Sequence, residues 1–369
     1  MTDTVRRRPG TLDPEPPAAL GPEAETLLGA AVAGLVLAAS PLLVAPGGVS
    51  PPGFGDMGPL LFGAAAEQRV LPLLAFLAGA VGTLLADHRV RRGERAVAVW
   101  LGSLRPLAVL AVLGALHGLL HPGDVLFPLV VIAVVVLFPV AWLPGWIVLL
   151  AGVLGTVLGV TVMGGHWVIP GMLLLGMAAV RHPPAAWPPR DARDLWAVLL
   201  IGSGGATGML LGYGVHPGGP YQTQIQSLTG LLTAAAGAAA VLLVLRLPLV
   251  GAALAWVLRP LGRMPVTCYL TATPAVALLG RSVVPPDAGP HPVVTVAVTV
   301  LVAQLCWGRW WLARHEEGPV EGYCRRLTDR RTVRTGAVRP RTAGAADGGD
   351  WSLRPAVHPT ARSRKTRCL

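Results

Sequence analysis

Charged residues are scarce in this chain: Asp, Glu, Lys and Arg make up 13% of its 369 residues, against about 25% in soluble domains. Hydrophobic residues make up 53%, and the mean hydropathy is +0.59. This composition excludes an ordinary soluble enzyme. Lysine is nearly absent, since Lys365 is the only one, so arginine supplies the net charge of +11. The arginines lack the interleaved aromatic residues of a nucleic-acid surface, and no nucleic-acid partner is expected.

Paired cysteines and local cofactor motifs are also lacking. Cys268, Cys306, Cys324 and Cys368 include no pair in an outward loop, which argues against a disulfide framework. No His or Cys pair has zinc spacing, no glycine run has the strand-turn-helix context of a phosphate loop, and no serine lies in a nucleophile elbow. Neither a metal nor a defined cofactor follows from these patterns.

Long apolar segments are what the chain does have. A helix needs about 20 largely apolar residues to cross the hydrocarbon of a bilayer. Ten segments qualify: about 26–46, 69–86, 104–121, 125–141, 143–163, 166–180, 195–213, 227–247, 264–280 and 293–312. Residues 248–263 predict a short interfacial helix, because Leu249, Ala252 and Trp256 share one side. We expect an all-α integral membrane protein, a polytopic bundle of about ten transmembrane helices.

The basic residues of the short loops predict the orientation of this bundle. With the N-terminus inside, the outward loops hold only Arg69 and Arg281. The inward loops then hold Arg89, Arg91, Arg92, Arg95, Arg105, Arg181, Arg190, Arg193, Arg246, Arg259 and Arg263. Both termini are therefore expected in the cytoplasm. The dominance of Arg, Ala, Val, Leu, Gly and Pro is typical of a GC-rich genome, so we expect a multi-pass protein of a bacterial cytoplasmic membrane.

Four regions follow from this topology. Residues 1–25 form a cytoplasmic N-terminal segment, 26–312 the transmembrane helical domain, 313–330 a cytoplasmic C-terminal motif, and 331–369 a basic tail. The tail has few large apolar side chains and is expected to be disordered. Its arginines favour anionic lipids of the inner leaflet, so membrane lipids are expected partners. The oligomeric state does not follow from the sequence.

The third span carries the strongest candidate for chemistry, since ionisable groups at membrane depth are costly and usually functional. His117 lies near the outward end of this span. It can serve as a base near neutral pH, and Asp124 would orient it if the chain folds back at Pro122-Gly123. The alternative is that both residues only cap a tight outer turn, and the same alternative holds for His121.

Two further outward features are candidates for substrate binding. His166 opens the sixth span and would share an outer vestibule with His117, although a histidine beside Trp167 is more often a boundary anchor. The polar outward loop 213–226 would line a substrate entrance or serve only as a solvated connector.

A basic and hydroxyl cluster marks the inner start of the ninth span. Arg259 and Arg263 are candidates for holding a phosphorylated cofactor or a lipid head group, because guanidinium forks match phosphate. Arg263 and Tyr269 are candidates for substrate binding. Ordinary positive-inside anchoring predicts the same arginines.

In two other spans, glycines repeat every four residues, at Gly204, Gly208 and Gly212 and at Gly155 and Gly159, which predicts close helix approach.

Three stretches carry a family pattern. They are Trp310–Arg314 with Gly318–Glu321 and Arg325–Thr328, then Gly262–Leu270, then His117 with Gly123–Leu126. Together they resemble the YeiB-type family of bacterial membrane proteins, known as domain-of-unknown-function family 418, from about Leu71 to Thr328. The family's first span usually opens with Asp-x-x-Arg-Gly, whereas residues 23–29 lack the arginine. A tyrosine usual after the Gly-Asp-Ile-Leu motif is also missing. If the first motif serves chemistry in relatives, this member is altered.

The family is distantly similar to transmembrane acyltransferases that move acyl groups onto extracytoplasmic sugars. This resemblance implies acyl-coenzyme A as donor and an extracytoplasmic glycan or lipid-linked molecule as acceptor, with His117 and Asp124 as catalytic residues. The alternative is a transporter or lipid-handling protein without catalysis, although no Asp or Glu lies well inside a span to couple ions. A third hypothesis is a non-catalytic membrane component that acts through its basic tail.

Overall fold

The computed structural model describes residues 21–44, 69–121, 124–181, 191–215, 221–285 and 290–329. All regular structure in these ranges is helical, which confirms the predicted class. The N-terminal segment up to residue 20, Arg190, residues 216–220 of the polar loop and the tail 331–369 lie outside the described residues, so the predictions made for them are not addressed.

Helices occupy all ten apolar segments expected from the sequence. They are α1 (Pro22–Val44), α4 (Leu71–Arg91), α5 (Ala96–Leu120), α6 (Leu126–Val140), α7 (Gly145–Leu158) with the π-helical turn η2 (Gly159–Met163), α8 (Val168–Arg181), α9 (Ala192–Val215), α10 (Gln222–Leu245), α12 (Pro265–Val283) and α13 (Pro290–Leu312). The main difference is α5, which begins at Ala96, before the expected start at residue 104. Arg105, which was counted with the arginines of an inward loop, therefore lies inside this helix.

Seven of the described helices are long and apolar enough to cross a membrane: α1, α4, α5, α7 with η2, α9, α10 and α13. The apolar helix α6 is shorter, with 15 residues, and α8 has 14. The chain is therefore a helical membrane protein, whereas a count of ten spans and the orientation stay predictions.

Two helices lie outside the ten apolar segments. The predicted interfacial helix is present as α11 (Pro248–Arg263), on which Leu249 and Trp256 are exposed. A short helix that the sequence did not predict, α14 (Pro319–Asp329), follows α13. Its start has proline at the first position and Glu321 in the first turn, both favourable at a helix N-terminus.

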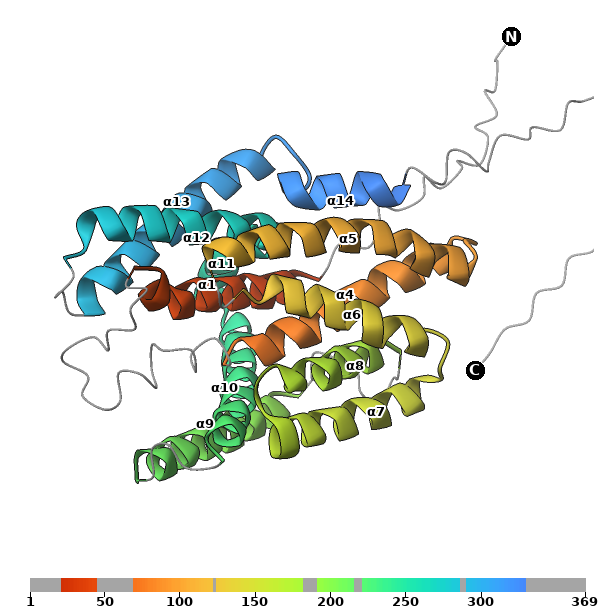
Figure 1. Cartoon of the computed structure of the whole chain (residues 1–369), viewed down its shortest axis with the longest axis horizontal. Coiled ribbons are helices and arrows are strands. Elements are labelled where there is room, and N and C mark those ends of the chain that lie inside the picture. Colours follow the sequence, from red (N-terminus) through yellow and green to blue (C-terminus); the bar gives the residue numbers. More distant parts are fainter. Residues whose placement is uncertain are drawn as a thin grey trace, which may run out of the picture. The chain divides into compact units, whose positions relative to one another are not determined.

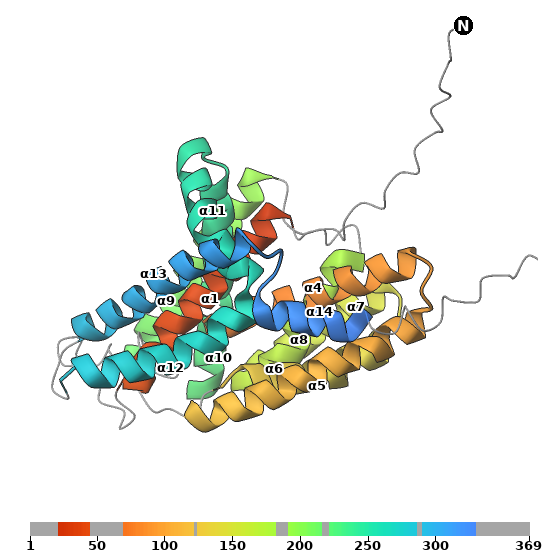
Figure 2. The same cartoon turned by 90° about the horizontal axis from the view of Figure 1, so that it is seen from above.

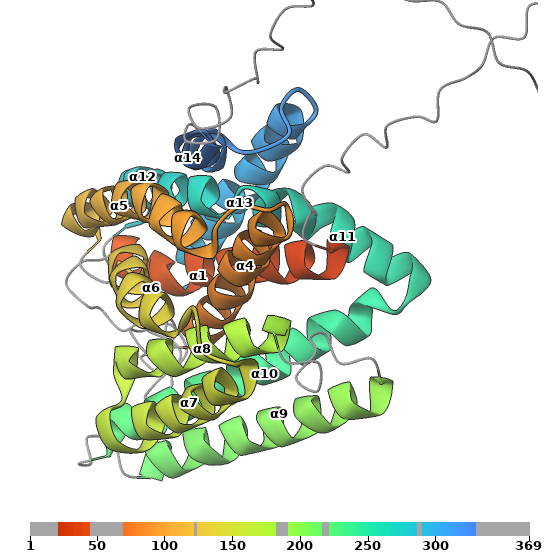
Figure 3. The same ribbon diagram turned by 90° about the vertical axis from the view of Figure 1, so that its right-hand side faces the viewer.

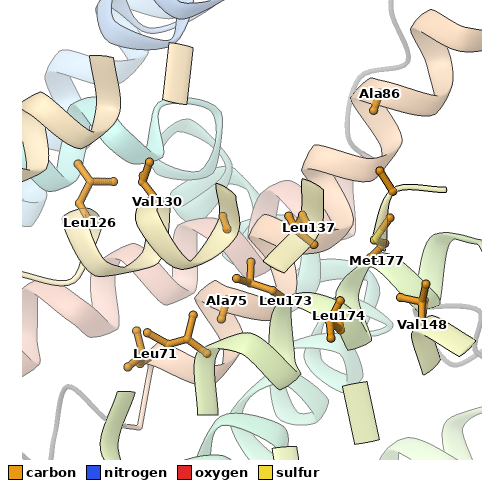
Figure 4. Packing of buried hydrophobic residues seen from close by; sticks show 14 of the residues in the cluster. Leu71, Ala75, Ala86, Leu126, Val130, Leu137, Val148, Leu173, Leu174 and Met177 are labelled. Atoms are coloured by element: carbon orange, nitrogen blue, oxygen red, sulfur yellow. The ribbon is translucent and has the colours of Figure 1, made fainter. Parts of the chain in front are cut away.

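The largest hydrophobic core lies between α4, α6, α7 and α8. Leu71 and Ala75 of α4, Val130 of α6 and Leu173 of α8 are buried together in it (Figure 4). Helix α1 passes through the middle of the described structure and contacts α4, α10, α11, α12 and α13 (Figures 1 and 3). Figure 3 shows α9 on one side of this bundle and α14 on the other.

Glycine allows the closest helix contact in this core. A Cβ atom on Gly176 of α8 would overlap the backbone of Phe76, and one on Gly79 of α4 would overlap the backbone of Leu173. The two helices thus meet backbone to backbone at reciprocal glycines. Gly155 and Gly159 also pack closely, against Gly171 and Trp167, as expected.

The prediction for Gly204, Gly208 and Gly212 was wrong. Among the described residues, none lies within 4 Å of a Cβ atom placed on any of them. Gly202 and Gly205 of the same helix approach Leu232 of α10 instead, because the packed face of α9 is shifted from the glycine repeat.

The glycine contact between α4 and α8 gives a stability prediction. Gly176→Ala should lower the melting temperature of the detergent-solubilised protein, because overpacking costs about 1–3 kcal/mol. Gly208→Ala is the matched control, since no described residue lies within 4 Å of its new methyl group and alanine favours helix. Equal melting temperatures of the two variants would contradict the close approach of α4 and α8.

Candidate functional site

The candidate site forms where the C-terminal end of α5 meets the N-terminal end of α12. From this meeting point the two helices extend in opposite directions, as Figures 1 and 2 show. Residues from the two ends touch directly, since Tyr269 of α12 bonds to Asp124, which follows α5. Segments 145 residues apart in the chain therefore build one site.

His117 and Asp124 form the centre of the site, as the sequence predicted. The Nδ1 atom of His117, in the last turn of α5, lies 2.7 Å from Oδ1 of Asp124. The side chains are 3% and 4% exposed, so the pair is shielded from solvent. Gly114 and Gly118 line the inner side of this turn, where a Cβ on Gly114 would overlap the backbone of Phe127.

The second oxygen of Asp124 caps the next helix. Its Oδ2 atom accepts the backbone N–H of Phe127 at 2.8 Å, in the first turn of α6. The cap fixes the carboxylate on the turn, and the carboxylate in turn fixes the ring of His117. The turn-capping role and the histidine-orienting role are thus carried by different oxygens of one side chain.

Tyr269 completes the site from α12. Its hydroxyl donates to Oδ1 of Asp124 at 3.0 Å and accepts the backbone N–H of Val125 at 3.3 Å. Its ring lies 4.7 Å from the ring of His117, centroid to centroid. The sequence placed Tyr269 with the inner arginines and gave no sign of this contact, because nothing in a linear pattern reports the packing of α12 against α5.

One polar atom of the site has no partner among the described residues. With Nδ1 bonded to Asp124, the Nε2 atom of His117 is buried and makes no hydrogen bond within this part of the chain. A buried polar atom without a partner costs free energy, so such atoms often mark a place where a ligand binds. His121, one turn further, is also buried, and its ring lies 6.4 Å from that of His117.

The carboxyl group of Asp124, in the turn outside both helices, has a shifted pKa. Burial raises this pKa, but hydrogen bonds from His117, from the N–H of Phe127 and from Tyr269 act in the opposite direction and outweigh it. The pKa of Asp124 therefore lies below its ordinary value, and the carboxylate form is favoured. An ionised Asp124 favours the tautomer of His117 with its proton on Nδ1.

The other predicted site residues lie in different surroundings. His166 is in the 3-10 turn η3 (Gly165–Trp167), which packs on α8 and α10. Arg259 donates from Nε to Glu25 of α1 at 2.9 Å, with 46% of its side chain exposed. Arg263 donates to the backbone oxygen of Glu316 at 2.6 Å and is exposed. The described contacts of these three residues are with segments other than the His117 turn.

A glutamate that the sequence did not single out for chemistry lies one turn from Tyr269. Glu321 of α14 binds the N-terminus of α12 through Val266 and Thr267. The only sequence signal was its place in the Gly-Pro-Val-Glu motif. In the described part of the chain, no group of three or more His, Cys, Asp or Glu side chains is placed to hold a metal ion.

The lowered pKa of Asp124 gives a pH prediction. Because the pKa is lower in the folded state, ionised Asp124 stabilises the fold above the unfolded pKa of about 3.9, and this contribution is lost as pH falls. Asp124→Asn should therefore lower the melting temperature at pH 7 and lose this difference toward pH 3. Exposed Asp194 on α9 supplies the control, Asp194→Asn. A wild-type advantage that persists unchanged at pH 3 would contradict the shift.

Residues 184–331 match the model of a family described as "Protein of unknown function (DUF418)". No curated protein and no solved structure matches the chain. The matched residues include Tyr269, Arg263 and Glu321, whereas His117 and Asp124 precede them. The family predicted from the three motifs is supported in this region: residues 184–331, less than half of the chain, match the DUF418 family of proteins of unknown function.

Proposed function

We propose that this membrane protein is an acyltransferase-like enzyme in which His117 is the general base. The observation that carries the proposal is the pairing of His117 Nδ1 with Asp124, which leaves Nε2 buried and without a partner among the described residues. A carboxylate on one ring nitrogen and a free second nitrogen is the arrangement that activates a hydroxyl nucleophile. A buried histidine that only closed the turn would be expected to have both ring nitrogens hydrogen-bonded.

The proposed reaction moves an acyl group from a thioester donor to a hydroxyl acceptor. Nε2 of His117 takes the proton of the acceptor hydroxyl while its oxygen attacks the acyl carbonyl carbon. The new C–O bond forms, the C–S bond breaks, and the histidine returns its proton to the leaving thiolate. Asp124 holds the imidazole and stabilises its transient positive charge, as the carboxylate of a catalytic triad does.

We propose ten spans with both termini inside, in a bacterial cytoplasmic membrane. The contact of Tyr269 with Asp124 places the start of α12 and the end of α5 at one depth, so these two helices are displaced from each other along the membrane normal. An acyl-coenzyme A donor would approach from the cytoplasm and a glycan or lipid-linked acceptor from outside.

The inner arginines are the proposed site for the phosphates of the donor. Arg263, six residues before Tyr269, is exposed, and Arg259 leaves half of its side chain free beyond its pair with Glu25. One guanidinium group can bind a phosphate group through two parallel N–H···O hydrogen bonds. Arg263 also holds the backbone of Glu316, so its loss would disturb the connection to α14 as well. His166 is retained only as a proposed contact of the acceptor.

The catalytic role of His117 can be measured with purified protein in lipid nanodiscs and labelled acetyl-coenzyme A. His117→Ala should reduce acyl transfer or thioester cleavage about 10²–10⁴-fold per folded molecule. His121→Ala is the matched control, because this buried neighbour should affect folded yield without such a loss. Asp124→Asn should lie between the wild type and His117→Ala.

Two outcomes would contradict this function. Wild-type protein that neither binds nor cleaves acyl-coenzyme A would remove the enzyme hypothesis and favour a transporter or lipid-handling protein. Full activity per folded molecule in His117→Ala would leave the histidine as a turn residue only.

The proposed orientation is tested by single introduced cysteines in a background without the native ones. A membrane-impermeant maleimide added to intact cells should label Tyr221→Cys and leave Arg91→Cys and Arg259→Cys unlabelled. Labelling of Arg91→Cys from outside would reverse the orientation, and with it the proposed sides for donor and acceptor.

A further inference from the structure

The contacts of α14 give Glu321 a role that the family description does not contain. We propose that Glu321 is a positioning residue that holds the first turn of α12 in place and thereby keeps the Tyr269 hydroxyl on Asp124. This inference rests on the proposed function, because it treats the His117–Asp124 pair as the reacting centre. If the inference holds, α14, which carries Glu321, helps to position the residues of the candidate site.

Glu321 makes three hydrogen bonds to the start of α12. Its Oε1 atom accepts the backbone N–H of Val266 at 2.9 Å and that of Thr267 at 3.0 Å. Its Oε2 atom accepts the hydroxyl of Thr267. The same hydroxyl oxygen accepts the backbone N–H of Val320, beside Glu321. Both carboxylate oxygens are thus engaged by one turn of one helix.

The first turn of α12 has no cap of its own. Met264, which precedes the helix, makes no side-chain capping bond, and Pro265 has no N–H to satisfy. The N–H of Cys268 already bonds to the backbone oxygen of Met264. The amides of Val266 and Thr267 are therefore the ones left open, and Glu321 satisfies both. Its negative charge also suits the positive end of the helix dipole.

The segment before α14 fixes Glu321 in this position. The indole of Trp311 donates to the backbone oxygen of Glu317, and Arg263 donates to that of Glu316. Gly318 is buried, and a Cβ atom there would crowd the side chain of Met264. The connection from α13 to α14 is thus held to the start of α12 at several points.

The helix α14 links both halves of the candidate site. It contacts α12 at its N-terminus and lies alongside α5, the helix that carries His117 (Figure 2). Tyr269 follows Thr267 by only two residues, in the turn that Glu321 holds. If this turn frays, the Tyr269 hydroxyl moves from Oδ1 of Asp124, and the carboxylate loses one of the bonds that orient it toward His117.

Hydrogen exchange of the full-length protein in nanodiscs tests the contact without any assumption about activity. In Glu321→Gln the amides of residues 266–269 should exchange at least about tenfold faster, because bonds to a charged group hold them in the wild type. Glu317→Gln is the matched control, since Glu317 bonds to Arg325 and not to α12. Unchanged exchange in Glu321→Gln would overturn the proposal.

A second variant keeps the test usable if Glu321→Gln does not fold. Thr267→Val removes one of the three bonds and should give a smaller increase in exchange of the same amides. No increase in a folded Thr267→Val protein would likewise contradict the proposal that Glu321 holds the first turn of α12.

A double-mutant cycle then tests the link to Tyr269. Tyr269→Phe and Glu321→Gln should each lower the acyl-transfer rate constant per folded molecule, and the double variant should be within about twofold of Tyr269→Phe. Multiplying losses would show that Glu321 acts by general stability and not through Tyr269. If the wild type transfers no acyl group, the proposed function fails, whereas the exchange result still decides whether Glu321 holds α12.

Discussion

In a lipid environment every backbone N–H and C=O must find a partner within the protein, and the described fold follows from this requirement. Helices satisfy it along their length, so the critical places are those where the backbone leaves a helix. One is the turn between α5 and α6, where Asp124 caps α6. Another is the start of α12, where Glu321 binds two open amides. Tyr269 joins these two places through its hydrogen bond to Asp124.

The candidate chemistry arises from the same capping groups. One oxygen of Asp124 closes a turn, and the other orients His117. The structural and the functional readings of this pair are therefore compatible, because one carboxylate serves both. The distinguishing feature is the second nitrogen of His117, which is buried and has no partner among the described residues. A purely structural histidine in so dry a place would be expected to use both nitrogens.

The family match covers only one half of the candidate site. The match begins at residue 184 and contains the Tyr269 half, with Glu321 and the arginines. The His117 half comes from α5 and the turn that follows it. The proposed active centre is thus an interface between the matched region and the helices before it. The glycine contacts that hold α4 against α8 support the α6 side of this interface through the same core (Figure 4).

The sequence by itself predicted the helical membrane class, the places of ten apolar helices and a short helix at α11, because each depends on composition or on neighbours within a few turns. It also indicated that Asp124 would reach His117 if the chain folds back at Pro122-Gly123, and the structure shows this contact. Only the tertiary structure decided that Tyr269 belongs to this pair, that Glu321 caps α12, and that no described residue packs on Gly204, Gly208 and Gly212. These depend on the axial offset of α12 against α5 and on the rotation of α9 about its axis. Side-chain packing between distant segments sets both quantities, and no local pattern of residues encodes them.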